Sequence, residues 1–596
     1  MNLASQRSTR RSRRDAHIDT QGSGGAGRRR RRLTVVLSAL ALTAVLLAPC
    51  AAGAETGTAA VAWGSNLKAR LGAGYESNSE ERPRTVLGLS EVASLAGGWN
   101  DTFALLGNGT VRSWGSNIFG QLGDGTAENR IAPVTVKNQA SAELTHVTEI
   151  ATTGDHALVL LENGSVATWG DSEDGTRGNG ESGVIKEAQE MHEKFGTPYE
   201  NRYLAGELKL AAKVTAIAVA GATNIALLEN GKIMTWGGNG NGKLGIGVEP
   251  GGKKEEAFAP ETCKLSSSPE KKETEPEAGN VACSKYPVEV KLPTLPEGVT
   301  ITNVAGGYGT GYAILSNGEV LAWGNGAGGA LGNGATASSD VPVKVNLENV
   351  PSCPEVSEAP HCPIVRVSAG KQIAWGLLAD GEVVGWGWNQ SGQLGSESTE
   401  ECKKEQPNDC STKPKVVVGS GFGKVSAMSV GNESGGLILV GTNMYSLGSN
   451  EWGLLGVGGL EEAKFTRVPL LIEGLAPVVG VSAGEQSYEA ILKEGAGPAP
   501  VLTITPSSKA LTVKWTVKAK EVMLRLKIVS EKGVEVAKGK ESKTIALPST
   551  ECSVEKPCTY KYTEVRSGEQ LTSEDGYEVR FQSEEATRKI TGTPLP

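Results

Sequence analysis

Short apolar runs alternate with glycine- and asparagine-rich turns through most of this chain. One stretch shows the unit clearly: apolar runs at 147–151, 156–161 and 165–169 are separated by Gly154-Asp155 and by Asn163-Gly164. An Asn-Gly pair between two such runs indicates a type I′ hairpin, because that turn needs positive φ at both central positions. The pattern predicts three antiparallel strands per unit, and a Pro-Val pair such as Pro133-Val134 marks a fourth, short edge strand.

The unit recurs seven times. The third run of each copy ends in an apolar residue followed by glycine: Trp63-Gly64, Trp114-Gly115, Trp169-Gly170, Trp236-Gly237, Trp323-Gly324, Trp386-Gly387 and the weakened Leu447-Gly448. A glycine turn precedes each second run, at Gly98, Gly154, Gly221, Gly307, Gly370, Gly431 and Gly484. Seven copies of a four-stranded unit predict an all-β, seven-bladed β-propeller over residues 55–497.

The order of the runs also predicts how the propeller closes. The repeats begin with a Trp-Gly strand, Val61 to Gly64, and end with a glycine-turn strand, Ser487 to Leu492, that lacks its hairpin partner. We expect these two strands to pair in one blade, which removes the exposed edges of an open array. The repeated tryptophans are expected to pack between blades rather than to form a sugar-stacking row.

The repeat resembles a known family. The order Trp-Gly-x-Asn, Gly-Gln-Leu-Gly, Ala-Gly and Asn-Gly, best seen at Gln121-Leu122-Gly123 and Gln393-Leu394-Gly395, is similar to the regulator of chromosome condensation repeat. The resemblance spans about residues 59 to 494, departs from the pattern at Arg177, and implies a seven-bladed propeller. The nuclear nucleotide-exchange role of the eukaryotic members is not expected here, because the features of an exported protein described below oppose it.

Beyond Pro498-Ala499-Pro500 the periodicity changes. Strict alternation, as in Leu511, Val513, Trp515 and Val517, predicts strands with one buried face. Residues 498–596 resemble a fibronectin type III domain, which implies a small β-sandwich with Trp515 and Tyr577 in its core.

The amino terminus has the features of an export signal. An arginine block at 28–32 precedes an apolar run at 33–48, and Ala52-Gly53-Ala54 follows. A charged region, a short apolar region and a small-residue cleavage site are typical of a secretory signal peptide. Residues 1–54 are therefore expected to direct the protein to the cell surface or the medium, with an uncleaved anchor helix as the alternative.

The cysteines support export independently. Cys50 lies in the signal, and the other eight form four close pairs: Cys263 with Cys283, Cys353 with Cys362, Cys402 with Cys410, and Cys552 with Cys558. Local disulfides that hold long loops are expected in an oxidising compartment. Metal ligation is the competing interpretation, but no pair has C-x2-C spacing and no histidine cluster accompanies one, so no metal site is predicted.

Neither composition nor motifs predict chemistry. The formal net charge is −8, although the first 54 residues carry ten arginines and only two acidic residues, so the rest is strongly acidic. An acidic body gives phosphate backbones nothing to bind, which argues against a nucleic-acid partner. No nucleophile elbow, metalloprotease helix or phosphate loop occurs, so no catalytic residue and no cofactor is predicted.

Long insertions distinguish the repeats from one another. They cover 181–213, 248–286, 350–363 and 396–415, and we expect them on one face or on the outer rim of the propeller. The sequence predicts an exported, non-enzymatic binding or scaffold protein whose loop aromatics Phe195, Tyr199, Tyr203 and Phe258 anchor an unknown protein or cell-surface macromolecule. The alternatives are a secreted enzyme inhibitor resembling propeller-type β-lactamase inhibitory proteins, and an exported enzyme with a site in the central funnel.

Overall fold

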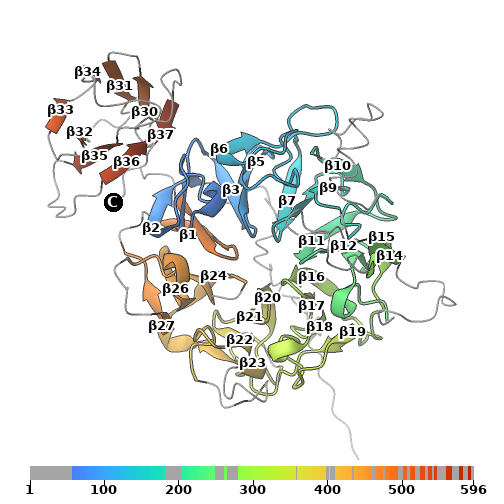
Figure 1. The fold of residues 1–596 in the computed structure, drawn as a ribbon. Coiled ribbons are helices and arrows are strands. Elements are labelled where there is room, and N and C mark those ends of the chain that lie inside the picture. The colour runs from blue at the N-terminus through green and yellow to red at the C-terminus, as the bar shows by residue number, and fades with distance from the viewer. Residues whose placement is uncertain are drawn as a thin grey trace, which may run out of the picture. The chain divides into compact units, whose positions relative to one another are not determined.

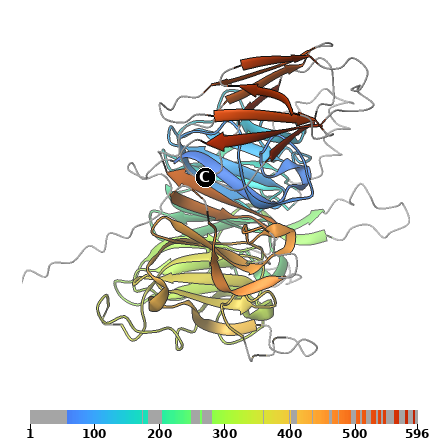
Figure 2. The ribbon, with the colours of Figure 1, turned by 90° about the vertical axis from the view of Figure 1, so that its left-hand side faces the viewer.

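A computed structural model shows seven antiparallel sheets arranged as blades around a central axis (Figure 1). Figure 2 gives the same ribbon turned by 90°. The structure describes residues 57–172, 174–180, 203–247, 261–264, 280–357, 359–397, 400, 402, 410–432, 435–458, 464–473, 475 and 477–493, and the strands between 501 and 591. None of the helices within these ranges has the length and hydropathy needed to cross a bilayer.

Blades 1 to 3 follow one another along the chain. Blade 1 comprises β3 (Val92–Gly97), β4 (Asp101–Leu106), β5 (Val111–Gly115) and β6 (Arg130–Thr135). Blade 2 comprises β7 (Val147–Thr152), β8 (His156–Leu161), β9 (Val166–Gly170) and β10 (Gly206–Leu208). Blade 3 comprises β11 (Val214–Ala220), β12 (Thr223–Leu228), β13 (Ile233–Gly238) and β15 (Asn280–Glu289), and β14 (Glu261–Lys264) adds a fifth strand.

Blades 4 to 6 repeat the same order. Blade 4 comprises β16 (Ile301–Gly306), β17 (Thr310–Leu315), β18 (Val320–Gly324) and β19 (Ser339–Lys344). Blade 5 comprises β20 (Ile364–Ala369), β21 (Ile373–Leu378), β22 (Val383–Trp388) and β23 (Cys410–Val418). Blade 6 comprises β24 (Val425–Val430), β25 (Gly435–Val440), β26 (Asn443–Ser449) and β27 (Phe465–Leu471). Short 3-10 turns are η1 (Leu67–Ala69), η3 (Gly240–Gly242), η4 (Ala327–Gly329), η5 (Ser420–Phe422) and η6 (Glu451–Gly453).

Blade 7 is built from both ends of the propeller. Its inner strands β28 (Val478–Ala483) and β29 (Ser487–Lys493) come from the end of the repeats, and β1 (Gly57–Ser65) and β2 (Ser79–Thr85) come from the start. Strand β1 pairs antiparallel with β29 in the register Val61 to Ala490 and Trp63 to Tyr488. This is the pairing expected from the sequence. One bridge from Gly57 to Val92 then links blade 7 to blade 1.

The hairpins between second and third strands differ from the expected type I′ turn. In blade 1 Gly109 has φ 76°, but Asn108 is not among the residues with positive φ. The Gly109 N–H donates to the Leu106 carbonyl, and the Asn108 side chain accepts from the Thr110 N–H. The loop is therefore a type I turn closed by a left-handed glycine, and the asparagine serves as a local acceptor. The hairpin prediction is right and its turn type is wrong.

Six of the seven blades are tied to the preceding blade by a buried tryptophan of their third strand. The indole Nε1–H of Trp169 in blade 2, for example, donates to the Gln121 carbonyl of blade 1 at 2.7 Å. The same bond runs from Trp63 to Leu454, from Trp114 to Arg70, from Trp236 to Thr176, from Trp323 to Lys243 and from Trp386 to Ala330. All six side chains have no exposed surface, so the strand tryptophans are core residues.

Blade 6 lacks this tryptophan, and its neighbour compensates. Leu447 occupies the position in blade 6, while Trp375 of strand β21 in blade 5 lies in the same apolar cluster. The Trp375 indole donates to the Gln393 carbonyl at 3.0 Å, which is the repeat position that a blade 6 tryptophan would reach. The buried carbonyl keeps its partner, so the departure at Leu447 leaves the interface intact.

The carboxy-terminal strands form two four-stranded antiparallel sheets. One contains β30 (Val501–Pro506), β31 (Ala510–Thr516), β34 (Ser542–Ala546) and β37 (Arg588–Thr591). The other contains β32 (Leu524–Ser530), β33 (Glu535–Gly539), β35 (Thr559–Arg566) and β36 (Gly576–Arg580). The alternating run from Leu511 to Val517, which was expected to be a strand, corresponds to β31. The sandwich packing and the core roles of Trp515 and Tyr577 stay predictions.

Deleting residues 55–64 should destabilise the propeller far more than deleting residues 498–596. The first deletion removes β1 and leaves β29 with an unpaired edge, whereas the second removes no blade strand. Thermal melts followed by near-ultraviolet circular dichroism provide the measurement. Equal losses of melting temperature in the two deletions would contradict closure through β1.

Replacing Trp169 by Phe should lower the free energy of unfolding by about 1–3 kcal/mol, because the Gln121 carbonyl stays buried without its donor. Trp99→Phe is the matched control, since that ring is 39% exposed. Urea denaturation measures both. An equal effect of the two substitutions would show that the indole bond contributes nothing measurable between blades.

Candidate functional site: the mouth of the central channel

A ring of glycine turns surrounds one end of the central channel. The first strands of the blades line this channel, and each leads into a turn at its glycine. Adjacent turns lie so close that a Cβ on Gly370 would collide with the Gly431 carbonyl oxygen. Gly431 meets Gly484 in the same way, at 2.7 Å. A side chain does not fit at these positions, which explains the repeated glycine.

The residue after each glycine lies in the turn at the channel mouth, and it differs in every blade. In blade order these ring residues are Trp99, Asp155, Ala222, Tyr308, Lys371, Asn432 and Glu485. Backbone bonds between blades fix their positions: Tyr308 N–H donates to Gly370, Lys371 N–H to Asn432, and Glu485 N–H to Gly98. Trp99 and Tyr308 are each 39% exposed despite their size. The fold therefore presents variable side chains on a fixed circle.

Charges also gather at the mouth. Burial and the carboxylates of Glu485 and Asp155 raise the pKa of the Tyr308 hydroxyl, while Lys371 opposes the shift. The Lys371 ammonium lies 5.8 Å from the centre of the Tyr308 ring, and the Asn432 amide donates to Glu485 at 3.1 Å. Two carboxylates against one ammonium make the ring acidic.

A buried ionisable cluster lies under the ring at the junction of blades 7 and 1. The Arg70 guanidinium donates to the Trp99 carbonyl at 2.7 Å and to the Asn100 side chain. Burial lowers the pKa of Arg70 to about 10, although Glu485, Asp101 and Glu489 oppose this. Burial, aided by Asp155, raises the pKa of Asp101 well above its usual range, while Arg70 opposes the shift.

Two more charged groups line the channel itself. Glu149 on β7 accepts a hydrogen bond from the Ile217 N–H at 3.1 Å, yet burial raises its pKa to about 8. Arg366 on β20 attracts it electrostatically across the channel, and burial lowers the pKa of this guanidinium. The sequence does not show that carboxylates converge at the channel. Glu149, Asp155 and Glu485 belong to repeats that are far apart in the chain, and only the closed propeller places them around one axis.

A separate pocket of about 520 Å3 opens beside the mouth, between blades 5, 6 and 7. Trp388, the last residue of β22, and Trp452, in the connection after β26, both line it. Neither tryptophan belongs to the repeated strand position, and the repeat pattern therefore does not predict them. Turn residues Gln372 and Asn432 complete the side nearest the channel.

The insertions do not all lie on one face. Strands alternate in direction, so connections between third and fourth strands lie at the same end as the channel mouth. Three insertions begin and end at the channel-mouth end of the strands that flank them. These are the insertions that start at 181, 248 and 396, which lie between β9 and β10, β13 and β14, and β22 and β23. The 350–363 insertion follows a fourth strand, β19, and lies at the opposite end. The expected common face is wrong for that insertion.

Of the four predicted anchor aromatics, the structure describes one. Tyr203 is only 4% exposed, and its ring packs against Gly120 of blade 1, where a Cβ would collide with it. Its role as a surface anchor is therefore wrong, because the segment before β10 folds into the interface between blades 1 and 2. Phe195, Tyr199 and Phe258 lie outside the described residues.

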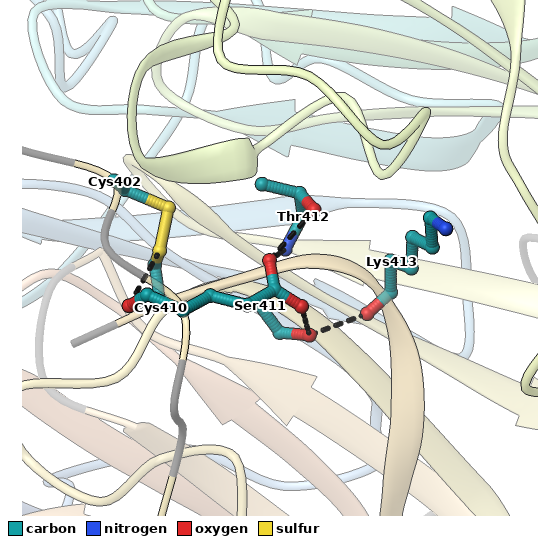
Figure 3. The surroundings of a disulfide bond; sticks show 6 residues. Cys402, Cys410, Ser411, Thr412 and Lys413 are labelled. Atoms are coloured by element: carbon teal, nitrogen blue, oxygen red, sulfur yellow. Dashed lines mark hydrogen bonds between the residues drawn. A yellow bond between two sulfur atoms is a disulfide. The ribbon is translucent and has the colours of Figure 1, made fainter. Parts of the chain in front are cut away.

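Three of the four predicted disulfides are formed. They join Cys263 to Cys283, Cys353 to Cys362, and Cys402 to Cys410. At the last of these, the Glu400 carboxylate accepts from both the N–H and the hydroxyl of Thr412 at 2.7 Å, which fastens the loop to β23 (Figure 3). Cys552 and Cys558, like residues 1–54 with their predicted export signal, lie outside the described residues.

Other candidate chemistry has a structural explanation. Cys353 and Cys362 lie near Asp380, but the two sulfurs are bonded to each other and are not available to a metal. His156 is buried, its Nε2 lies 3.1 Å from the Asn224 side-chain oxygen, and burial lowers its pKa to about 4. It is a neutral core residue at physiological pH.

Regulator of chromosome condensation (RCC1) repeats match residues 108–160, 317–375 and 380–437, and a second description of the repeat matches 92–121, 147–176 and 364–393. The chain therefore carries RCC1 repeats in its seven-bladed propeller. The yeast protein Prp20p from Saccharomyces cerevisiae superposes with a TM-score of 0.55 at 18% identity, over 74% of this chain and 92% of that one. Human WBSCR16 gives 0.55 at 16% identity, over 73% and 99%. These likenesses show the fold.

Sequence relatives differ widely in length. The mitochondrial RCC1 domain-containing protein RUG3 of Arabidopsis thaliana is 27% identical over 336 residues, which are 56% of this chain and 62% of RUG3. The ultraviolet-B receptor UVR8 of the same plant is 26% identical over 71% of this chain and 91% of UVR8. The human E3 ubiquitin-protein ligase HERC2 aligns over 69% of this chain but over 7% of its own length.

The stability of the propeller should depend on pH through Glu489. This residue of β29 is fully buried and accepts from the Ser487 hydroxyl at 2.9 Å, and burial raises its pKa to about 8. The pKa of Glu489 in the folded state exceeds its unfolded value of about 4.3. Its contribution to the free energy of unfolding is therefore fully present below about pH 4.3, and it is lost as the pH rises through about 8. Glu149 adds to the same trend.

We expect Glu489→Gln to melt at a higher temperature than the wild type at pH 9 and at nearly the same temperature at pH 5. The exposed Glu297→Gln is the control at both pH values. A Glu489→Gln curve parallel to the wild type across this range would contradict the assignment.

Proposed function

We propose that this protein is an exported, non-enzymatic binding or scaffold protein that engages a macromolecular partner through the propeller face carrying the channel mouth. Export rests on the signal-like segment 1–54 and on the disulfides, which are typical of oxidising compartments. The observation that carries the binding role is the ring of unlike residues on a fixed circle of glycine turns.

The ring supplies what a protein interface needs. Trp99 and Tyr308 offer large, partly exposed rings, and binding energy concentrates in a few such residues. The Tyr308 N–H donates to the Gly370 carbonyl and the Trp99 carbonyl accepts from the Arg70 side chain, so little backbone freedom is lost when a partner docks. A face of this kind can bury a standard interface of about 1,600 Å2.

The charge of the face favours a basic or neutral partner. Asp155 and Glu485 outnumber Lys371 at the mouth, and the body of the chain is acidic. A propeller of this fold serves as a binding protein in yeast, where Prp20p binds Gsp1p and histones. An exported, acidic chain has a different partner, whose association should slow as salt rises.

The same experiments also test two alternative functions. A secreted enzyme inhibitor would use the same face, and its partner would be an enzyme. An enzyme with a site in the funnel gains some support from Glu149, Asp155 and Glu485, which the fold gathers at the axis. Hydrolysis of any tested glycoside, ester or peptide by the purified protein would end the non-enzyme proposal.

The double substitution Trp99→Ala and Tyr308→Ala should weaken partner binding at least tenfold without changing the melting temperature. The partner is first identified by passing cell-wall fractions and culture supernatant over immobilised wild-type protein, and its affinity is then measured by surface plasmon resonance. Val365→Ala is the control, because that side chain is 43% exposed at the opposite end of β20.

A second variant separates the ring from the insertions. Replacing 181–202 and 248–260 by short Gly/Ser loops leaves every described strand in place. Reduced binding by this variant and by the double substitution would show that loops and ring act together. Undiminished binding by both would place the interface elsewhere and refute the proposal.

A further inference from the structure

The pocket between blades 5, 6 and 7 has the chemistry of a carbohydrate site. Two tryptophans from successive blades, Trp388 and Trp452, line it together with the side chains of Gln372, Gln390 and Glu451. Its volume of about 520 Å3 falls within the range of roughly 300–1,000 Å3 that is typical of small-molecule sites. It is also lined by Lys371 and Glu485 of the ring, but not by Trp99 or Tyr308.

Trp388 is held in place by its own blade and by blade 4. Its backbone N–H donates to the Gln372 carbonyl at 2.7 Å. Its ring lies over Gly328 of blade 4, where a Cβ would stand 2.9 Å from the ring edge. The six-membered-ring edge of the indole thus lies close to the Gly328 backbone, and Trp388 still lines the pocket. A supported aromatic wall needs no rearrangement to receive a flat ligand.

Trp452 occupies a backbone position that is costly for a tryptophan. Its φ is 61°, in the left-handed region, where a bulky side chain is a genuine outlier. The equivalent loop positions in other blades hold Lys68, Asn241 and Gly328, with φ of 60°, 59° and 67°. The repeat therefore dictates the conformation, and a glycine would satisfy it. Strained backbone of this kind clusters at ligand-binding sites. Trp452 is only partly buried, so core packing does not explain why a tryptophan occupies this position.

We infer that this pocket binds a short neutral oligosaccharide. The negative face of an indole attracts the weakly positive C–H groups of a pyranose ring. Glutamine side chains can both donate to and accept from sugar hydroxyls, and carboxylates accept from them. This combination of flat aromatic walls with neutral amides matches the two faces of a sugar, one apolar and one polar.

The same lining disfavours the other common small ligands. A lipid chain would take the polar groups of Gln372 and Glu451 out of water without offering them a hydrogen bond, which costs free energy. A nucleotide would bring phosphates to a pocket with two carboxylates, Glu451 and Glu485, and a single ammonium, Lys371. A sugar site here goes beyond the proposed function, because its ligand does not need the ring aromatics.

Isothermal titration of the full chain with chitotetraose and with cellotetraose tests the inference. We expect at least one of them to bind, and Trp452→Gly to weaken that binding at least tenfold with an unchanged or higher melting temperature, since glycine suits the left-handed backbone. Asn241→Gly is the matched control: it has the same left-handed backbone in blade 3 but does not line the pocket. Gln390→Ala, on an exposed side chain, should weaken binding as well.

The outcomes distinguish this site from the macromolecular interface. The double substitution Trp99→Ala and Tyr308→Ala should leave oligosaccharide affinity unchanged even where it abolishes partner binding. No heat of binding from either oligosaccharide at millimolar concentration would overturn the inference. Unchanged oligosaccharide affinity in Trp452→Gly would also overturn the inference. The same holds if the pocket binds a peptide segment of the protein partner and neither oligosaccharide.

Discussion

The structure depends on one contact between successive blades, in which an indole N–H donates to a buried carbonyl of the preceding blade. Six tryptophans of the repeated strand make this bond, for example Trp114 to Arg70 at 2.7 Å. The acceptor lies in the turn that carries the Gly-Gln-Leu-Gly pattern, so the contact also fixes the loop that borders the channel-mouth face. The ring side chains can vary because this packing holds the frame beneath them.

The fold was largely predictable because its signals are local and repeated. Strand order, blade number, closure through Val61–Gly64 and three local disulfides all follow from spacing along the chain. The turn type of the Asn-Gly hairpins could not be predicted in this way, because hairpins with loops of different length use the same two residues. Trp375 shows a second limit: it takes over an interaction from another blade, and only the packed interface reveals the substitution.

The candidate site was less predictable, for a physical reason. Aromatic residues in long insertions were expected to be exposed, but Tyr203 is buried because its segment folds against blade 1. The exposure of Trp99 and Tyr308 was missed for a different reason. Each follows a turn glycine of the repeat, so the sequence pattern assigns each to an ordinary turn. Comparing the residues that follow the seven glycines as one set would have found them. The pocket tryptophans had no such signal, since Trp388 and Trp452 occupy different repeat positions.

The face also contains a cluster of buried ionisable groups. The two ends of the propeller meet in blade 7, next to the cluster of Arg70, Asp101 and Glu489, whose burial is unfavourable for their charged forms. Arg70 nevertheless joins the closure to the mouth, because its guanidinium holds the Trp99 carbonyl and its own carbonyl accepts from Trp114. A hydrophobic replacement would lose the bond that fixes Trp99 and would leave the Asn100 side chain without this donor. The buried charge is therefore best understood as the means by which the closing blade positions the channel-mouth face.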